Sequence, residues 1–148
     1  GRRELPVEEI ILGPGQTCLA PGEIVAHFRL PRPGPRAGDA YLRLIPRTEM
    51  DIAVVGAGVS LELDADGLCT GCRVGLGAVA PTPLRLDEAQ AILVGRRVEG
   101  SGLDDLAAAA SAAAQPIDDM RATAEYRVRV VGVMAKRAAQ IAATRAGG

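Results

Sequence analysis

Three short stretches of the sequence carry residue types that could do chemistry: a glycine pair, a cysteine pair and a cluster of arginine with aspartate. The glycine pair, Gly56-Ala57-Gly58, follows a hydrophobic run, as the phosphate loop of a dinucleotide-binding fold follows its first strand. That loop needs a third small residue and then a helix whose N-terminus faces the phosphates. The third position here is Leu61, and Val59, Leu61 and Leu63 alternate with polar residues. The pattern therefore predicts a strand that enters a hairpin, and we expect no dinucleotide to bind at these glycines.

The cysteine pair, Cys69 and Cys72, has the Cys-x-x-Cys spacing of redox centres and of half a zinc site. A redox pair normally opens a helix, whose N-terminus lowers the thiol pKa, whereas a strand pattern follows here. A zinc site needs two more ligands, and only Cys18 and His27 could help. His27 is expected to be an exposed, non-catalytic side chain, since no Ser or Cys nucleophile stands beside it. We expect the cysteines to be two small residues after a turn, with no metal and no functional disulfide.

Composition excludes several classes of protein. The 148 residues suffice for one ordinary domain, and the net charge of -1 provides no field that attracts polyanions. One Phe, two Tyr and no Trp are too few for the stacking platforms of single-strand binders, so nucleic acid is not an expected partner. No apolar run reaches the ~20 residues that span a bilayer. No secretory signal pattern is visible, and a cytoplasmic location is expected.

The first half of the sequence is patterned as strands. Residues 1–22 are expected to form an irregular lead-in with a short strand candidate at 8–12. In residues 23–30, apolar Ile24, Ala26, Phe28 and Leu30 alternate with mostly polar neighbours, which predicts a half-buried strand. The elements expected next are a loop at 31–39, a short element at 40–45, a strand at about 52–64, a turn at Asp64–Gly67 and a strand at 69–79. Three glycines in the last of these strands, Gly71, Gly75 and Gly77, suggest the close approach of a packed element.

The second half is patterned as helices. A helix is predicted over 86–94, with Gly95 as its C-terminal cap candidate. The spacing of Ser101 and Asp104 resembles a capping box ahead of an alanine-rich helix to about 114. The last helix is predicted over roughly 120–144, with Tyr126, Val130, Met134 and Ile141 near one face. Strands followed by helices predict an α+β fold, in which three helices pack on one face of an antiparallel sheet.

Several segments together resemble one protein family, and they keep its order and approximate spacing. They are Tyr41-Leu-Arg43, the run 46–54, the Gly-Ala-Val-Ala-Pro-Thr-Pro run 77–83, Leu93-Val-Gly95 and the run 116–127 with Pro-x-Asp-Asp-x-Arg. The sequence resembles the C-terminal domain of the FAD-binding (medium) subunit of molybdenum hydroxylases. Carbon monoxide dehydrogenase and xanthine dehydrogenase are enzymes of this type. The stretch GQTCLAPGEIV, residues 15–25, resembles the family's junction between domains, so we expect a lead-in at 1–22 and the family's C-terminal domain at 23–148.

The resemblance implies a fold, a cofactor and partners. The family's C-terminal domain is a three- or four-stranded antiparallel sheet with three helices, in agreement with the pattern above. The intact subunit would hold FAD and receive electrons from molybdopterin through two [2Fe-2S] clusters. The iron-sulfur small subunit and the molybdopterin large subunit would be its partners. A homo-oligomer of this chain is a further possibility.

The sequence also departs from the family, which holds FAD mainly through glycine-rich segments in two preceding domains. The sequence has neither segment. It begins with Gly1 and ends Ala-Gly-Gly, so a processed chain or an excised fragment is expected. On its own the chain is expected to retain no FAD and to be catalytically inactive, as a piece of an oxidoreductase subunit. The rival function is a stand-alone binding or assembly module without enzymatic activity. The junction-like lead-in favours the first hypothesis.

The resemblance points to the segment from Tyr41 to Asp51 as the part nearest the isoalloxazine ring. Arg43, Arg47 and Asp51 are the candidate cofactor-binding residues, and no catalytic residue or metal ligand is expected. A cation beside the ring would stabilise the negative charge of the reduced flavin. Pairing of Arg47 with Asp51 to tie the segment down remains an equal alternative. Three further polar residues are expected to cap a helix: Asp118, Asp119 and Arg121.

Overall fold

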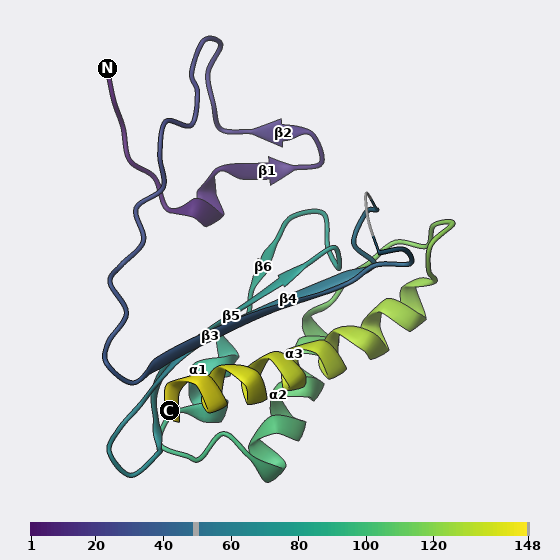
Figure 1. Ribbon diagram of the computed structural model, residues 1–148. Helices are drawn as coiled ribbons and strands as arrows, with labels where there is room; N and C mark the ends of the chain where they lie inside the picture. Colours follow the sequence, from purple (N-terminus) through teal and green to yellow (C-terminus); the bar gives the residue numbers. More distant parts are fainter. Residues whose placement is uncertain (49–50, 148) are drawn as a thin grey trace.

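An antiparallel sheet of four strands forms the centre of the fold in the computed structural model, which describes residues 1–48 and 51–147 (Figure 1). The strands lie side by side in chain order: β3 (Ala37–Leu44), β4 (Val55–Leu63), β5 (Cys69–Gly77) and β6 (Leu84–Arg85). Apolar residues of β4 at alternate positions are buried, and the intervening Ser60 and Glu62 are exposed. The strands predicted at 52–64 and 69–79 are confirmed as β4 and β5, which are a few residues shorter than predicted.

The first strand of this sheet begins earlier than the sequence indicates. β3 starts at Ala37, inside the predicted loop at 31–39, because Gly38 and Asp39 pair with Leu61 and Ser60 of β4. The short element predicted at 40–45 is therefore the end of a longer strand. Pairing with a partner strand overrides the weak local propensity of these glycine and aspartate residues.

The hairpin between β4 and β5 forms as the sequence predicts. The Asp64 carboxylate accepts hydrogen bonds from the backbone N–H groups of Asp66 (2.9 Å) and Leu68 (2.8 Å). Gly67 has a φ of 78°, a left-handed conformation that glycine adopts without steric cost. The aspartate and the glycine thus fix a turn that returns the chain into β5.

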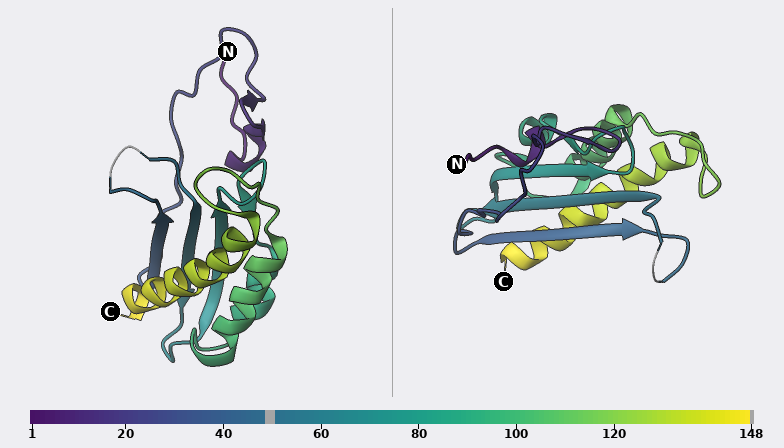
Figure 2. Two further views of the ribbon diagram at one scale, coloured as in Figure 1. Left: turned by 90° about the vertical axis from the view of Figure 1, so that its right-hand side faces the viewer. Right: turned by 90° about the horizontal axis from the view of Figure 1, so that it is seen from above.

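Three helices cover one face of the sheet (Figure 2). They are α1 (Glu88–Leu93), α2 (Gly100–Ala113) and α3 (Ala124–Gly147). α3 lies against β3 and β4, α2 packs on α3, and α1 packs on β5 and α2. The predicted α+β fold with helices on one face is confirmed. Among the described residues, no helix combines the length and the apolar character needed to cross a membrane.

The helix ends follow the sequence signals only in part. Gly95 follows α1 with a φ of 80°, as expected of a C-terminal cap. α3 is capped by Thr123, whose Oγ1 accepts from the N–H of Tyr126 at 3.2 Å. The predicted capping box at Ser101 is wrong, because α2 already begins at Gly100 and its N-cap makes no side-chain hydrogen bond.

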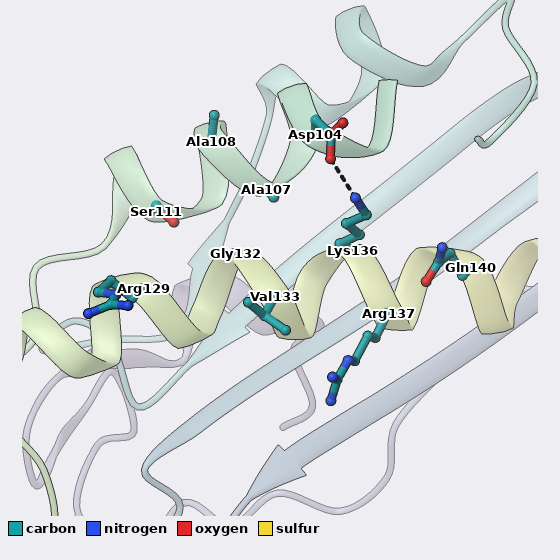
Figure 3. Close-up of a pocket in the computed structure, with 10 residues that line it drawn as sticks. All are labelled: Asp104, Ala107, Ala108, Ser111, Arg129, Gly132, Val133, Lys136, Arg137 and Gln140. Carbon is teal, nitrogen blue, oxygen red and sulfur yellow. Dashed lines mark hydrogen bonds and ion pairs between the residues drawn. The ribbon is translucent and has the colours of Figure 1, made fainter. Parts of the chain in front are cut away.

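Two glycines allow helix α3 to lie unusually close to its neighbours. A Cβ atom on Gly38 of β3 would lie 2.1 Å from the carbonyl oxygen of Ala142 in α3. A Cβ atom on Gly132 of α3 would lie 2.6 Å from the carbonyl oxygen of Ala107 in α2 (Figure 3). Both neighbours are backbone atoms, so they cannot move aside without displacing a helix.

The close approach predicted at the glycines of β5 is wrong. A Cβ atom on Gly71 or Gly77 would meet nothing within 4 Å, and one on Gly75 would meet only a carbonyl oxygen at 3.9 Å. These glycines lie on the face of the sheet that the helices leave open. They leave that face flat.

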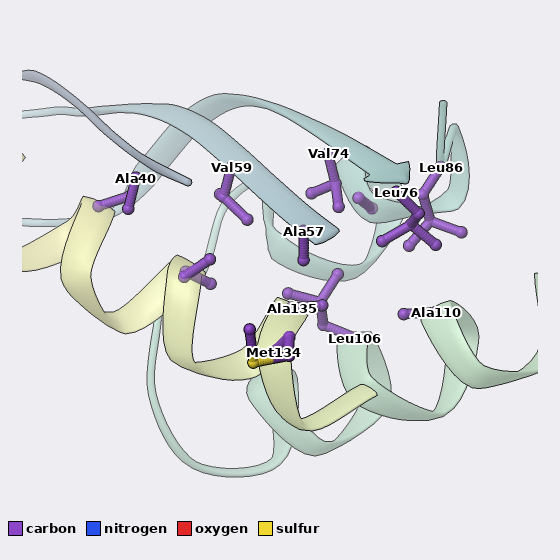
Figure 4. Close-up of a cluster of buried hydrophobic side chains, with 14 of the residues drawn as sticks. Ala40, Ala57, Val59, Val74, Leu76, Leu86, Leu106, Ala110, Met134 and Ala135 are labelled. Atoms are coloured by element: carbon purple, nitrogen blue, oxygen red, sulfur yellow. The ribbon is translucent and has the colours of Figure 1, made fainter. Parts of the chain in front are cut away.

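The core lies between the sheet and the helices (Figure 4). Ala57, Val74 and Leu76 point from the sheet toward Leu106 of α2 and Ala135 of α3, and all are almost fully buried. Because the helices contribute mainly alanine here, their backbones can lie close to the strands.

The buried face of α3 differs from the predicted one. Met134 is buried, but Tyr126 and Ile141 are 49% and 36% exposed. The buried stripe consists mainly of small residues together with one charged side chain: Arg127, Val131, Gly132, Met134, Ala135, Ala138, Ala139, Ala142 and Ala146. A prediction that follows the largest apolar side chains misses a stripe that close packing restricts to alanine.

Residues 1–36 extend beyond the sheet and helices (Figure 1). They contain a 3-10 turn η1 (Val7–Glu9) and a small hairpin of β1 (Ile11–Gly13) and β2 (Gln16–Thr17). The predicted strand candidate at 8–12 thus overlaps β1. The half-buried strand predicted at 23–30 is wrong for this structure, since these residues form no regular element and are all exposed. Their alternating pattern has no partner strand among the described residues.

We expect Gly38→Ala to lower the free energy of unfolding by about 1–3 kcal/mol, because the new methyl group displaces α3 from the sheet. Gly71→Ala is the matched control in the same sheet, and its expected change is below about 0.5 kcal/mol. Urea unfolding followed by circular dichroism measures both. Equal stability of the two variants would contradict the close approach at Gly38.

Candidate functional site

Asp51 is the last residue of the segment that the sequence singles out, Tyr41 to Asp51. Its side chain is 6% exposed, and its Oδ2 accepts a hydrogen bond from Nε of Arg47 at 3.1 Å. Its Oδ1 accepts from Nε of Arg121 at 3.3 Å and from the backbone N–H of Ile52 at 2.8 Å. Donation by Arg47 is the largest cause that holds the pKa of Asp51 below its ordinary value, and Arg121 adds to it. The pairing of Arg47 with Asp51, which the sequence left as an alternative, is therefore present.

Arg127 is a second charged group with little exposure, and the residue as a whole is 4% exposed. Its Nη1 donates to the carbonyl oxygens of Val54 (2.7 Å) and Ala78 (3.3 Å), which precede β4 and follow β5. Its Nη2 donates to Oδ1 of Asp119 at 2.7 Å. Its Nε has no partner among the described residues. The guanidinium therefore joins the first turn of α3 to the ends of two strands.

Asp119 connects this buried cation to Arg121. Its Oδ1 also accepts from the backbone N–H groups of Arg121 (2.8 Å) and Ala122 (3.1 Å). Nη1 of Arg121 lies 3.7 Å from Oδ2 of Asp119. The hydrogen bond from the backbone of Arg121 is the largest cause that lowers the pKa of Asp119, and Arg127 adds to it. Asp119 therefore fixes a turn and an ion pair.

Five side chains form one network of alternating charge, which we call the arginine–aspartate network: Arg47, Asp51, Arg121, Asp119 and Arg127. It runs from an exposed end, where the Arg47 side chain is 74% exposed, to a buried end at Arg127. Three cations and two anions leave one net positive charge. The network joins the segment between β3 and β4 to the segment that precedes α3.

The helix-capping prediction for this region is only partly right. Asp118 accepts a hydrogen bond from the backbone N–H of Ala124, the first residue of α3, at 2.6 Å. Asp119 and Arg121 instead belong to the arginine–aspartate network, with no bond to an N–H of the helix among the described residues. A residue pattern can indicate a cap, but a partner 70 positions away along the chain, such as Asp51 for Arg121, is outside its reach.

Gly56 and Gly58 provide space for the ring of Tyr41. Gly58 pairs with Tyr41 of β3 and with Gly75 of β5, so the stretch lies in a strand between two others. A Cβ atom on Gly56 would lie 2.7 Å from Oη of Tyr41, and one on Gly58 would lie 3.5 Å from its ring. The prediction that these glycines lie in a strand is confirmed. No helix follows them directly, so the geometry of a phosphate loop is absent from these residues.

Arg43 lies two residues after Tyr41 on the same open face of the sheet, opposite Gly56. It is exposed, and no ion pair joins it to another described residue. The structure therefore brings Arg47 and Asp51 together but places Arg43 apart from them, beside the exposed ring of Tyr41. The phenol ring thus lies over Gly56 and Gly58, and the guanidinium of Arg43 is on the same face of the sheet.

A hollow of about 710 Å³ lies between this open face and the N-terminal segment. Tyr41, Gly58 and Gly75 form part of its floor, and Val7 and Ile11 line it from the N-terminal segment. Arg85 of β6 connects the sheet to the N-terminal segment across this hollow, since its Nη1 lies 2.7 Å from Oε1 of Glu8. The lining combines apolar side chains with two arginines, Arg73 and Arg85, and two carboxylates, Glu8 and Asp39. Arg43, Arg47 and Asp51 do not belong to it.

Cys69 and Cys72 lie on the covered face of the sheet and are 1% and 4% exposed. Hydrogen bonding between the two thiols lowers the pKa of Cys69 to about 7 and raises the pKa of Cys72. All three cysteines are free thiols. Within residues 1–48 and 51–147, no three His, Cys, Asp or Glu side chains are placed to hold a metal ion. Burial limits access of reagents to the thiols, and the absence of metal and of a functional disulfide stays a prediction.

A second hollow, of about 500 Å³, lies on the outer side of α2 and α3 (Figure 3). Arg129, Lys136 and Arg137 line it, and Lys136 pairs with Asp104 across it. The ion pair ties the two helices together. The groups that line this hollow show no arrangement of nucleophile and base.

Comparison with known proteins identifies the family to which this sequence is similar. The sequence profile of the CO dehydrogenase flavoprotein C-terminal domain matches residues 40–142. The chain is 37% identical over 146 residues to the carbon monoxide dehydrogenase medium chain of Afipia carboxidovorans, which covers 99% of this chain and 50% of the relative. It is 29% identical to a putative xanthine dehydrogenase FAD-binding subunit of Escherichia coli, over 100% of this chain and 51% of the relative. The chain thus spans about half the length of these relatives.

Solved structures agree with the sequence comparison. Carbon monoxide dehydrogenase from Hydrogenophaga pseudoflava, in a form that lacks the Mo-pyranopterin moiety of its molybdenum cofactor, superposes with a TM-score of 0.92 and 34% identity. The superposition covers 98% of this chain and 50% of that one. The Cu,Mo-CO dehydrogenase in its cyanide-inactivated form superposes with a TM-score of 0.86 and 37% identity, over 93% of this chain and 48% of the other.

Sequence reasoning included Tyr41 in the candidate segment without giving it a role, and it missed Arg127. Arg127 could have been found, because it lies four residues before Val131 on the stripe that is otherwise apolar or small. A lone cation at such a position needs a buried partner. The contact of Tyr41 with Gly56 depends on the register between β3 and β4, which no local pattern indicates.

We expect Arg127→Met to lower the free energy of unfolding by about 2–4 kcal/mol, because it leaves two carbonyl oxygens and the Asp119 carboxylate without their donor. Arg129→Met is the control, since Arg129 is an exposed arginine two residues further along the same helix. Chemical unfolding of both variants at neutral pH measures the difference. A control as unstable as Arg127→Met would show that the loss does not come from the network.

Stability should depend on pH through the two carboxylates of the network. The pKa of Asp51 and that of Asp119 are lower in the folded chain, so the stability they provide is present above about pH 4. That stability is lost as the pH falls through the folded-state pKa values. We expect an Asp51→Asn/Asp119→Asn variant to be less stable than wild type at neutral pH, with the gap narrowing toward about pH 2.5. Urea midpoints at both pH values measure this, and a gap that stays constant would argue against the assignment.

Proposed function

Because this chain belongs to the CO dehydrogenase flavoprotein C-terminal domain family, we propose that it serves as the C-terminal domain of the FAD-binding subunit of a molybdenum hydroxylase. One observation carries the proposal: similarity to medium chains extends over essentially the whole of this chain but only about half of theirs. The domain completes the flavin site of a longer subunit and contacts partner subunits there.

The open face of the sheet, which the helices do not cover, suits one edge of a flavin. When bound, FAD supplies a centre that accepts electrons and passes them on. Arg43 stands exposed beside Tyr41, and a guanidinium there would stabilise negative charge on the reduced ring. The ring of Tyr41 occupies the space over Gly56 and Gly58, and Gly75 leaves the neighbouring strand β5 flat, so that a planar group could lie there beside the ring.

The described residues do not offer an equivalent place for the FAD pyrophosphate. Binding of that group commonly uses a glycine-rich loop at a helix N-terminus. Gly56 and Gly58 lie within a strand instead. The half of the subunit that this chain does not span would therefore bind the pyrophosphate, and the chain alone would hold FAD weakly.

Asp51 acts on this site through Arg47. Both of its carboxylate oxygens already accept from arginine, and its side chain is almost fully buried. We therefore assign Asp51 to positioning the exposed guanidinium of Arg47. This assignment combines the two alternatives for Arg47, flavin binding and pairing with Asp51. The ion pair that holds the segment in place would also orient the Arg47 guanidinium toward the flavin edge.

The partners in the proposal are an iron-sulfur small subunit and a molybdopterin large subunit. Molybdopterin and [2Fe-2S] clusters would reside there, and electrons would reach the flavin from them. The two related structures are molybdenum enzymes, which supports the molybdopterin part of this assignment. A stand-alone assembly module is less well supported, because similarity to longer subunits extends over essentially the whole of this chain.

A redox titration of the whole subunit tests the flavin-facing assignment. We expect Arg43→Ala or Arg47→Ala to lower the flavin potential by about 30 mV, a tenfold change for a two-electron couple, because a cation that favours the reduced form is lost. Arg129→Ala on the outer side of α3 is the control and should leave the potential unchanged. The flavin content of each variant is measured in parallel.

Two outcomes would contradict the proposal. If both variants kept the wild-type potential and flavin content, the arginines would be structural or surface charges. If the 148-residue chain alone purified with stoichiometric FAD, the proposed division of the flavin site between two halves of a subunit would be wrong.

A further inference from the structure

We propose that the hollow between α2 and α3, on the outer side of the domain, binds an acidic helix of a partner subunit. We call this hollow the helix groove; residues 104–111 of α2 and residues 129–140 of α3 line it (Figure 3). The inference rests on the proposed function for the existence of partner subunits. It adds a contact on the side of the domain that faces away from the open face of the sheet.

The helix groove has the shape and length that a third helix needs. Small residues form its floor: Ala107, Ala108 and Ser111 of α2 and Gly132 of α3. Its volume is about 500 Å³. The lining stretch of α3, from Arg129 to Gln140, extends for three turns or about 16 Å. A helix of about that length could lie in the groove, as helices commonly do in grooves of a partner protein.

The charge of the helix groove is positive, although the chain as a whole has a net charge of -1. Arg129, Lys136 and Arg137 line the groove together with one carboxylate, Asp104, which leaves two net positive charges. Lys136 is paired with Asp104. Arg129 and Arg137 form no ion pair with another residue of the described part of the chain. Two guanidinium groups of the groove thus lack a carboxylate partner.

The neighbouring carboxylates do not supply that partner. Asp105 of α2 lies 4.0 Å from Nη1 of Arg96, away from the groove lining. Glu125 lies one turn before Arg129 on α3, but no ion pair joins the two within residues 51–147. The carboxylates that would complement the groove therefore have to come from another molecule.

The spacing along α3 indicates the pattern of the bound helix. Arg129, Val133 and Arg137 follow one another at intervals of four residues, so they lie along one side of α3. Val133 is 46% exposed between the two arginines. Arg129 and Arg137 are about 12 Å apart along the helix axis. A helix that lies alongside α3 would match them with two carboxylates about two turns apart and an apolar side chain between these.

Two other occupants suit the helix groove less well. A lipid surface binds through a broad apolar face, whereas Val133 is the large apolar side chain among the groove residues that the structure describes. A second copy of this chain in a symmetric dimer would place the same positive surface against itself. Like charges that face each other across an interface are unfavourable. An acidic helix avoids both difficulties.

Charge reversal in the whole subunit tests the proposal. The flavin-containing subunit is mixed with the iron-sulfur small subunit or the molybdopterin large subunit of its own enzyme, and association is measured by analytical ultracentrifugation. Arg129→Glu and Arg137→Glu should each weaken binding to one of these partners at least about tenfold, because like charges would then meet. Arg97→Glu is the matched control, since it reverses an exposed arginine outside the groove. Its expected effect is below about twofold.

Salt dependence gives a second readout. Binding of the wild-type subunit should weaken as the ionic strength rises, and the two groove variants should lose part of that dependence. Their Tm and flavin content should equal those of wild type, because both arginines are exposed and lie away from the open face of the sheet. The proposal is overturned if the groove variants bind both partners as tightly as wild type does. It is also overturned if the wild-type subunit binds neither partner.

The remaining outcomes identify a different occupant or separate this inference from the proposed function. Binding to vesicles of anionic phospholipid that Arg137→Glu abolishes would make a membrane the occupant and contradict the proposal. A dimer of the subunit that Arg137→Glu dissociates would contradict it in favour of a second copy. A subunit that holds no flavin but binds a partner through the groove would support the inference and overturn the proposed function. A flavin-containing subunit whose groove variants assemble as wild type does would do the reverse.

Discussion

The hydrogen bonds of the buried Arg127 guanidinium hold together the end of the domain where α3 begins. A cation at 4% exposure is costly to bury unless it is paired, and Asp119 with two backbone carbonyls provides that pairing. The carbonyls belong to Val54 and Ala78, so one side chain of α3 fixes where β4 begins and where the chain leaves β5. Asp119 in turn places Arg121 against Asp51. The exposed Arg47 is thus held in place by a series of ion pairs that begins at the buried Arg127.

The two faces of the sheet have different roles because their residues differ in size. On the covered face, alanine and two close-approach glycines, Gly38 and Gly132, let α3 lie against strands and helix α2. On the open face, Gly56 and Gly58 of β4 make room for the ring of Tyr41, and the glycines of β5 leave a flat surface beside it. The same residue type therefore permits tight packing on one face and access on the other. The proposed flavin site would use the second arrangement, and a stable domain needs the first.

Residues 1–36 differ from the rest of the domain because part of their apolar surface is uncovered. Their ion pairs and small hairpin order them locally, but the apolar side of 23–30 has no cover among the described residues. The sequence prediction of a strand there was wrong for the isolated chain, yet its physical basis, alternation between apolar and mostly polar residues, is present. What the pattern lacked was a partner strand.

The sequence by itself determined the features that depend on local periodicity and turn chemistry. The alternation in β4, the Asp64–Gly67 turn, the three helices and hence the α+β class could be predicted, because each is encoded within a few neighbouring residues. The pairing of Arg47 with Asp51 could be anticipated for the same reason, since four positions separate them. Only the tertiary structure decided the contact of Tyr41 with Gly56, the partners of Arg127 and the tight approach at Gly38. These contacts join residues distant in the chain, and they exist only once strand register and helix placement bring the backbones together.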